Sequence, residues 1–177
     1  MVIPVLEALD LTGKTITTDA LLTPRTLAAY LLEHDAHYVF TVKDNQPTLL
    51  ADIRLIFEGR AQPDFRESLT LAHGRIEQRA IWTTTRLNAY LNFPGVGQAF
   101  VIERHTVAKK TGKTSTETVY GLTDHTPDRA DAAAILAFNR GHWTIENSCH
   151  YILDWNWDED RCTLRTGHGP ANITALR

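Results

Sequence analysis

The sequence has little cysteine and no long hydrophobic run, and these two absences exclude several classes of protein. Cys149 and Cys162 are the only cysteines among 177 residues, too few for a disulfide framework, which indicates a reducing compartment. No apolar stretch approaches the ~18 residues that a membrane span requires. Residues 1–4 also lack the basic and apolar regions of a signal peptide. We therefore expect a cytoplasmic protein that does not use a membrane.

An excess of basic residues is absent as well. The formal net charge is −3, whereas dedicated nucleic-acid-binding proteins usually carry a clear excess of lysine and arginine. This balance disfavours a protein that holds DNA by its overall charge, but it permits a metal-dependent nuclease, which needs acidic residues. The hydrophobic fraction of 43% is that of an ordinary globular protein. The length suits one well-buried core, so we predict a single domain over residues 1–177.

The first part of the chain alternates strand-like and helix-like segments. Residues 14–19 are rich in β-branched side chains and predict a short buried strand, and residues 38–42 predict a second one. A helix follows each strand, beginning near Pro24 and near Pro47, because proline suits the first turn of a helix. This order favours parallel pairing in an α/β sheet.

The middle of the chain has a different pattern. Residues 65–123 predict an antiparallel β-rich insertion with strands over 68–71, 74–84, 99–106 and 115–122. Residues 108–113 form the expected tip of one hairpin. A helical pattern returns over about 127–155, where Gly141 should weaken a continuous helix. The predicted fold is therefore α/β, with an antiparallel insertion before a C-terminal helix.

Asp19 is the first candidate for a chemical role. It follows the first predicted strand, and ligands of open α/β sheets bind at the carboxyl ends of the strands. The alternative interpretation is that Asp19 only caps the turn that follows it.

Glu146 is the second candidate. His142, Glu146 and His150 are spaced by four residues, so on a helix they share one face. A polar stripe beside an apolar one is typical of a helix that borders a site. Two alternatives remain: a solvated polar face, or a zinc site of these three residues with Cys149 or Cys162. A cysteine nucleophile is disfavoured, since Cys149 falls on the apolar face.

Two segments of the insertion carry basic residues. Lys109, Lys110 and Lys113 cluster at the predicted hairpin tip, where they can neutralise DNA phosphates or simply keep a turn soluble. Residues 73–79 alternate basic and acidic side chains. The structural explanation for that alternation is a ladder of cross-strand ion pairs on an exposed face of the sheet.

Six blocks of residues carry a family resemblance, in order along the chain. They span 17–20, 38–47, 73–79, 117–120, 140–161 and 165–177. The most specific block is Arg-Gly-His-Trp-Thr-Ile-Glu-Asn at residues 140–147. Together these blocks resemble the H-repeat-associated transposases of bacterial insertion sequences, a branch of the DDE transposases.

The resemblance implies a ribonuclease-H-like fold and a DNA strand-cleavage and transfer reaction. In that family, Asp19 and Glu146 match the second and third carboxylates of a triad that binds two Mg²⁺ ions, with Mn²⁺ as a substitute. The ions stabilise the attacking and leaving oxygens of a phosphodiester. The partner would be the DNA of the transposon ends. The candidate DNA contacts are Lys43, Asn45, His73, Arg75, Lys109, Lys110, His142 and Arg165.

The sequence departs from the family pattern in two places. Residues 1–13 contain only Glu7 and Asp10 as acidic residues, in an expected helix, and neither matches the first catalytic aspartate. His142 stands where related enzymes often carry arginine, so any phosphate contact there would depend on a partly charged imidazole.

These departures predict an incomplete ribonuclease-H-like domain. We expect residues 14–18 to form an exposed sheet edge that favours a homodimer, and the isolated chain to cut DNA poorly. The alternatives are a non-catalytic DNA-binding or regulatory remnant of a transposase, and a zinc-stabilised structural domain.

Overall fold

The computed structural model describes residues 2–22, 24–72, 74–144 and 167–168. The chain divides into two compact units, residues 1–139 and 140–177, and each is described by itself. Of the candidate residues named above, His73, Glu146 and Arg165 lie outside the described residues, as do the cysteines and His150.

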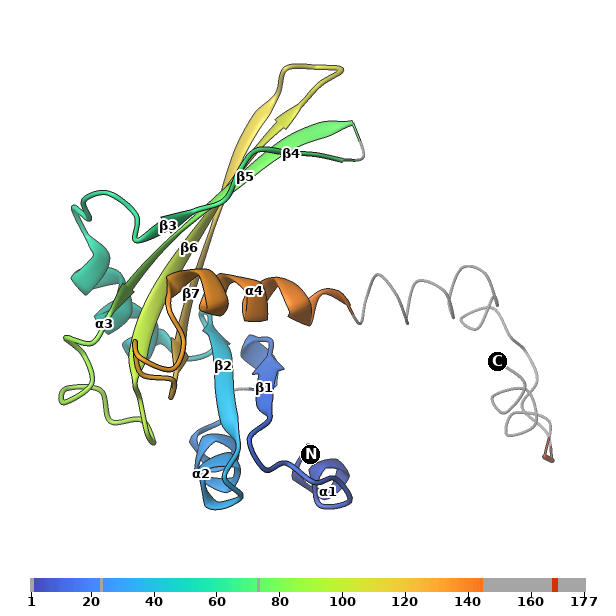
Figure 1. Cartoon of the computed structure of the whole chain (residues 1–177), viewed down its shortest axis with the longest axis vertical. Helices are drawn as coiled ribbons and strands as arrows, with labels where there is room; N and C mark the ends of the chain where they lie inside the picture. Colours follow the sequence, from blue (N-terminus) through green and yellow to red (C-terminus); the bar gives the residue numbers. More distant parts are fainter. Residues whose placement is uncertain (1, 23, 73, 145–166, 169–177) are drawn as a thin grey trace. The chain divides into compact units, whose positions relative to one another are not determined.

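The first unit is built on one seven-stranded sheet with the order β1-β2-β7-β6-β5-β3, in which β4 also pairs with β5 (Figure 1). Strand β1 is parallel to β2, and every other pairing is antiparallel. The strands are β1 Thr15–Thr18, β2 His37–Val42, β3 Phe65–Arg66, β4 Thr70–Ala72, β5 Arg75–Thr84, β6 Gln98–Ala108 and β7 Thr114–Thr123. The parallel pair and the antiparallel insertion confirm the predicted α/β pattern.

The helices begin and end close to the predicted signals. They are α1 Ile3–Leu6, the 3₁₀ helix η1 Ala20–Leu22, α2 Arg25–Glu33, α3 Pro47–Phe57 and α4 Ala132–His142. Pro24 is the N-cap of α2 and Pro47 occupies the first turn of α3, as expected for a residue without a backbone N–H. Helix α4 includes Gly141 and ends one residue later.

The expectation of a helix through Glu7 and Asp10 was wrong. Helix α1 ends at Leu6, and Asp10 lies beyond it. The carboxylate of Asp10 accepts a hydrogen bond of 3.1 Å from the backbone N–H of Thr12. This local bond favours a turn over a helix, because it gives the backbone donor a different partner.

Hydrophobic side chains pack on both faces of the sheet. Along β2, Tyr38 and Phe40 join one buried cluster with residues of α2 and α3, whereas Val39 joins a second cluster with residues of α4. The alternation follows from the two-residue period of a strand. Strand β2 is therefore covered on both faces. Strand β1, in contrast, forms one edge of the sheet, as the sequence predicted for residues 14–18.

Gly121 allows three central strands to approach one another. It lies on β7, opposite Thr41 of β2 and Phe100 of β6. A Cβ atom added there would overlap the ring of Phe100 and the backbone carbonyl oxygen of Phe40. The carbonyl belongs to the backbone of a buried strand and has little room to move.

The substitution Gly121→Ala should therefore lower the free energy of unfolding by about 1–3 kcal/mol, the usual cost of overpacking a core. The matched control is Gly141→Ala, where an added Cβ meets nothing within 4 Å. That change should leave stability unaltered or raise it slightly, because alanine favours a helix more than glycine does. Urea unfolding followed by circular dichroism measures both. A Gly121→Ala protein as stable as the parent would contradict the packing argument.

Candidate functional site

Asp19 lies at the carboxyl end of β1, where the parallel pair brings residues of β2 beside it. Lys43 and Asn45 directly follow β2, so they share this edge of the sheet with Asp19. The Asn45 side chain donates a hydrogen bond of 2.6 Å to the carbonyl oxygen of Ala20. Asn45 thus connects the loop after β2 to the loop that carries Asp19.

The Asp19 carboxylate has a structural role in this position. Its Oδ1 accepts a hydrogen bond of 3.0 Å from the backbone N–H of Leu21, which confirms the turn-capping interpretation. The same bond fixes the orientation of the carboxylate. A partly buried, oriented carboxylate at a strand end is the ligand type that Mg²⁺ prefers, so Asp19 fits the metal that the resemblance implies. The position of Glu146 is outside the described residues, and its approach to Asp19 stays a prediction.

The hairpin of β6 and β7 extends beyond the part of the sheet that the helices cover, and it carries the lysine cluster at its tip (Figure 1). The tip is closed by a hydrogen bond of 2.9 Å from the Ala108 N–H to the Lys113 carbonyl. Lys109, Lys110 and Lys113 are exposed. Within the described part of the chain none of the three forms an ion pair. Their charges are therefore accessible to an anionic partner.

Three arginines of this region, unlike the lysines at the tip, form ion pairs with glutamates. Arg75 and Arg79 both pair with Glu77 on β5, the latter at 2.9 Å, and Arg104 pairs with Glu117 across β6 and β7. The pairs within residues 73–79 run along β5 and involve the buried Glu77, so they differ from the cross-strand ladder on an exposed face that the sequence predicted. Arg75 retains an exposed side chain, which leaves its predicted DNA contact neither supported nor opposed.

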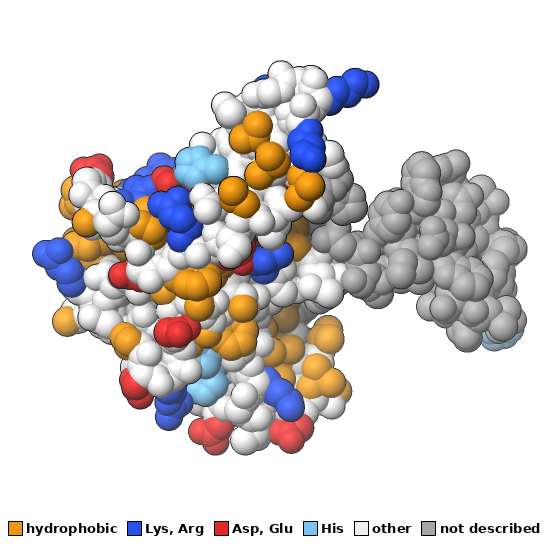
Figure 2. Space-filling model, turned by 45° about the horizontal axis from the view of Figure 1, so that its top comes forward, with side chains coloured by type: hydrophobic (Ala, Val, Ile, Leu, Met, Phe, Trp, Pro, Cys, Tyr) orange, Lys and Arg blue, Asp and Glu red, His pale blue; other side chains and the backbone are white. Residues whose placement is uncertain are grey.

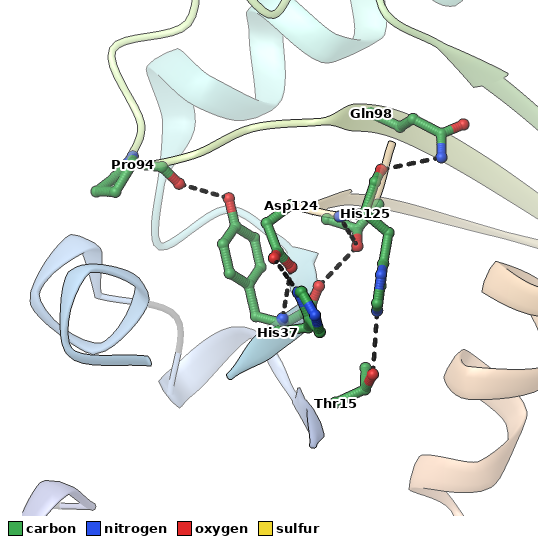
Figure 3. A network of polar contacts seen from close by, with 8 residues as sticks. Thr15, His37, Pro94, Gln98, Asp124 and His125 are labelled. Carbon is green, nitrogen blue, oxygen red and sulfur yellow. Dashed lines mark hydrogen bonds and ion pairs between the residues drawn. The ribbon is translucent and has the colours of Figure 1, made fainter. Parts of the chain in front are cut away.

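A network of polar side chains lies at the opposite end of the parallel pair (Figure 3). Asp124, just after β7, accepts two hydrogen bonds: one of 2.6 Å from Nδ1 of His37 and one of 2.7 Å from the backbone N–H of Tyr38. The ring of His125 lies 4.5 Å from that of His37, and its Nε2 is 3.0 Å from the hydroxyl of Thr15. Strand β2 and the loop after β7 therefore form one polar cluster, which we call the His–Asp cluster: His37, Asp124 and His125.

The backbone beneath this cluster is firmly held. Gln98, only 2% exposed, donates hydrogen bonds to the carbonyl oxygens of His125 at 3.0 Å and Ala130 at 2.9 Å. The Thr123 hydroxyl donates to the Tyr38 carbonyl at 2.7 Å and accepts from the His125 N–H at 3.1 Å. The loop after β7, which carries Asp124 and His125, is thus connected to both β2 and β6.

Burial lowers the pKa of His125 below its ordinary value of 6.5. The negative charge of Asp124 opposes that shift, and the positive charges of His37 and Arg129 reinforce it. A neutral imidazole in this position has a lone pair on one ring nitrogen.

The sequence patterns did not predict the His–Asp cluster. The available signal was weak: His37 precedes a predicted strand, and Asp124 and His125 follow another one more than eighty residues later. Only the antiparallel pairing of β2 with β7, in which Val39 faces Thr123, brings them together. Register between distant strands cannot be read from local patterns.

Comparison with known protein families identifies the family to which this chain belongs. The family model described as "Transposase DDE domain" matches residues 1–172, nearly the whole chain. The chain belongs to the DDE transposase family.

Curated relatives agree with this assignment. The "H repeat-associated putative transposase YhhI" of Escherichia coli K12 is 26% identical over 97% of this chain and 47% of its own length. The "Uncharacterized protein in dhlA 3'region" of Xanthobacter autotrophicus is 32% identical over 70% of this chain and 43% of its own. The chain thus spans about half the length of these relatives.

The matching family model describes a transposase DDE domain. The mixed sheet described above is consistent with such a domain. Among the described residues, no helix has the length and apolar character needed to cross a membrane.

Acidification should destabilise the chain through His125. Because its folded-state pKa is lowered, the unfolded chain binds the proton more readily, so the stability present above pH 6.5 is lost as the pH falls below that value. His125→Gln should remove this part of the slope, which cannot exceed about 1.4 kcal/mol per pH unit for one proton. Urea unfolding between pH 5 and 8 (roughly the range in which histidine titrates), in a chelating buffer, measures it. His34→Gln is the control, and an identical pH dependence in parent and His125→Gln proteins would refute the assignment.

Proposed function

We propose that this chain forms the C-terminal part of the catalytic domain of a DNA transposase, with Asp19 and Glu146 as the second and third carboxylates of a DDE triad. The observation that carries the proposal is the place of Asp19 at the carboxyl end of β1, next to the turn after β2, inside a family match over residues 1–172.

The residues around Asp19 have complementary tasks in this proposal. The Leu21 N–H orients the carboxylate, and Asn45 fixes the loop through the Ala20 carbonyl. Lys43 is exposed at the same edge and supplies a positive charge for a DNA phosphate. Two bound Mg²⁺ ions would neutralise the charge that develops on the phosphodiester oxygens.

We further propose that the remaining carboxylate of the triad comes from residues outside these 177. Glu7 directly follows α1 rather than lying on a strand, and Asp10 is engaged by Thr12, whose hydrogen bonds lower the pKa of that carboxyl. Neither lies on a strand beside β1. Among the described residues before β1, therefore, none offers a carboxylate on a strand for the first position of the triad.

Mn²⁺ binding tests the two proposed ligands directly. Asp19→Asn and Glu146→Gln should each weaken Mn²⁺ binding to the 177-residue chain at least about tenfold, because each removes a charged oxygen ligand. Electron paramagnetic resonance of free Mn²⁺ gives the affinities, and Glu33→Gln, which alters an exposed carboxylate at the end of α2, is the control.

A supercoiled-plasmid assay completes that test. The isolated chain should show no nicking above background with Mg²⁺ or Mn²⁺. Strong nicking that Glu146→Gln abolishes would refute the missing-carboxylate proposal. Unchanged Mn²⁺ affinity in both variants would refute the carboxylate assignment itself.

A second candidate function is DNA binding without catalysis, and the exposed lysine cluster at the β6–β7 tip favours it. Phosphate contacts there would be independent of sequence and would weaken with salt, since binding releases counterions from DNA. Such a protein would occupy DNA whether or not the triad were complete.

Replacing Lys109 and Lys110 by alanine should weaken binding to unrelated duplexes to a similar extent. The slope of log affinity against log salt concentration should fall by about one for each DNA phosphate that the variant no longer neutralises. Fluorescence anisotropy at several salt concentrations measures both quantities. Lys14→Ala, an exposed lysine directly before β1, is the control. If the double variant binds like the parent at every salt concentration, the tip does not contact DNA.

A further inference from the structure

His125 has a buried ring nitrogen that lacks a partner. The residue is 7% exposed, and no atom in the described part of the chain forms a hydrogen bond with its Nδ1. Its other nitrogen, Nε2, is 3.0 Å from the Thr15 hydroxyl and can donate a proton to it. In that tautomer Nδ1 carries a lone pair. Buried polar atoms are nearly always satisfied, so an unpaired one points to a missing ligand.

The other members of the His–Asp cluster lie close to His125 and carry further metal-binding atoms. One donor atom from each of His37, Asp124 and His125 lies within 4.8 Å of the others. Zinc bonds to nitrogen and oxygen are about 2.0–2.2 Å long in a tetrahedral site, so ligand atoms around one ion are roughly 3.4 Å apart. The largest separation in the set would have to shorten by no more than about 1.4 Å to reach that spacing.

The hydrogen bond between His37 and Asp124 is compatible with two ways of binding. Nδ1 of His37 donates one proton to Oδ2 of Asp124 over 2.6 Å. A metal ion can replace that proton and bind both atoms. Alternatively Asp124 keeps the proton bond and orients the opposite nitrogen of His37 toward the ion, as carboxylates commonly do behind metal-binding histidines. In both cases His37 and His125 supply nitrogen.

This cluster is separate from the proposed Asp19 site. Thr15 and His37 are paired at the amino ends of the parallel strands, whereas Asp19 follows the carboxyl end of β1. At ~3.3 Å per residue, the four-residue strand β1 puts about 13 Å between the two ends. One ion cannot reach both. The ligands differ too, because imidazole nitrogen favours Zn²⁺ whereas carboxylate oxygen favours Mg²⁺.

We propose that His37, Asp124 and His125 form a zinc-binding site that joins the start of β2 to the loop after β7. His37, with a side chain 22% exposed, gives the ion access from solvent. Asp124 and His125 are held in place by Tyr38 and Thr123, so the site requires little rearrangement. This inference does not rest on the proposed catalytic function.

Zn²⁺ titration of the metal-free 177-residue chain tests the proposal. Isothermal titration calorimetry should show one Zn²⁺ per chain, bound at least a hundredfold more tightly than Mg²⁺. His37→Gln and His125→Gln should each weaken Zn²⁺ binding at least tenfold. Co²⁺ in place of Zn²⁺ should give the visible absorption of a four-coordinate ion, and the same variants should abolish that absorption. Zn²⁺ should raise the Tm of the parent and not of the variants.

Two controls keep the outcome unambiguous. His105→Gln changes an exposed histidine on β6, and Asp19→Asn removes the proposed catalytic ligand; neither should alter Zn²⁺ affinity. Circular dichroism shows whether each variant is folded without metal. If His125→Gln does not fold, the Zn²⁺ affinity of His37→Gln, which changes a more exposed side chain, tests the proposal. Zn²⁺ binding that persists in a folded His37→Gln protein, binding abolished only in Asp19→Asn, or no Zn²⁺ preference in the parent would each overturn the proposal.

Discussion

The two pairings of strand β2 are the constraint on which the rest of the molecule depends. Its parallel register with β1, which sets Thr18 opposite Phe40, brings the loop of Asp19 next to the turn that carries Lys43. Its antiparallel register with β7 sets Val39 opposite Thr123 and so places Asp124 beside His37. A shift of one residue in either register would turn the buried side chains of β2 to the wrong face. Both candidate sites are therefore consequences of how one strand is aligned.

The core fixes that alignment. Tyr38 and Phe40 pack on one side of β2 and Val39 on the other, and all three are at most 2% exposed. Gly121 reinforces the arrangement, because its missing side chain leaves room for the ring of Phe100 and the carbonyl of Phe40. At the amino end of β2, burial of the Tyr38 ring raises the pKa of its hydroxyl, which donates to the Pro94 carbonyl at 2.7 Å. The strand is held at several points along its length.

Charge is distributed unevenly over this scaffold. Most arginines of the β-rich part are neutralised by neighbouring glutamates, as Arg79 is by Glu77, whereas the lysines at the tip of β6 and β7 are exposed. In Figure 2, Lys and Arg side chains project at the upper edge of the described part and also lie on its left and lower sides. A net charge of −3 is thus compatible with local contact to DNA, because phosphates respond to nearby charges rather than to the total. The acidic balance of the chain and its membership of a DNA-processing family do not conflict.

Local sequence signals were sufficient for every described strand except the two-residue β3, for α2 and α3, and for the hairpin tip at residues 108–113. Turn residues and hydrophobic periodicity act over only a few residues. The motif blocks, in their order along the chain, were sufficient to predict the family. The local signals and the motif blocks together predicted that Asp19 lies at the end of a strand. The partners of His37 were not predictable, because Asp124 lies 87 residues away and meets it only through the β2–β7 register. The prediction of a helix through Asp10 was wrong because of a local contact. The hydrogen bond between the Asp10 side chain and the backbone of Thr12 outweighed a helical pattern. Segments determine their own conformation through short-range contacts, whereas the side chains that share a site are chosen by the packing of the whole core.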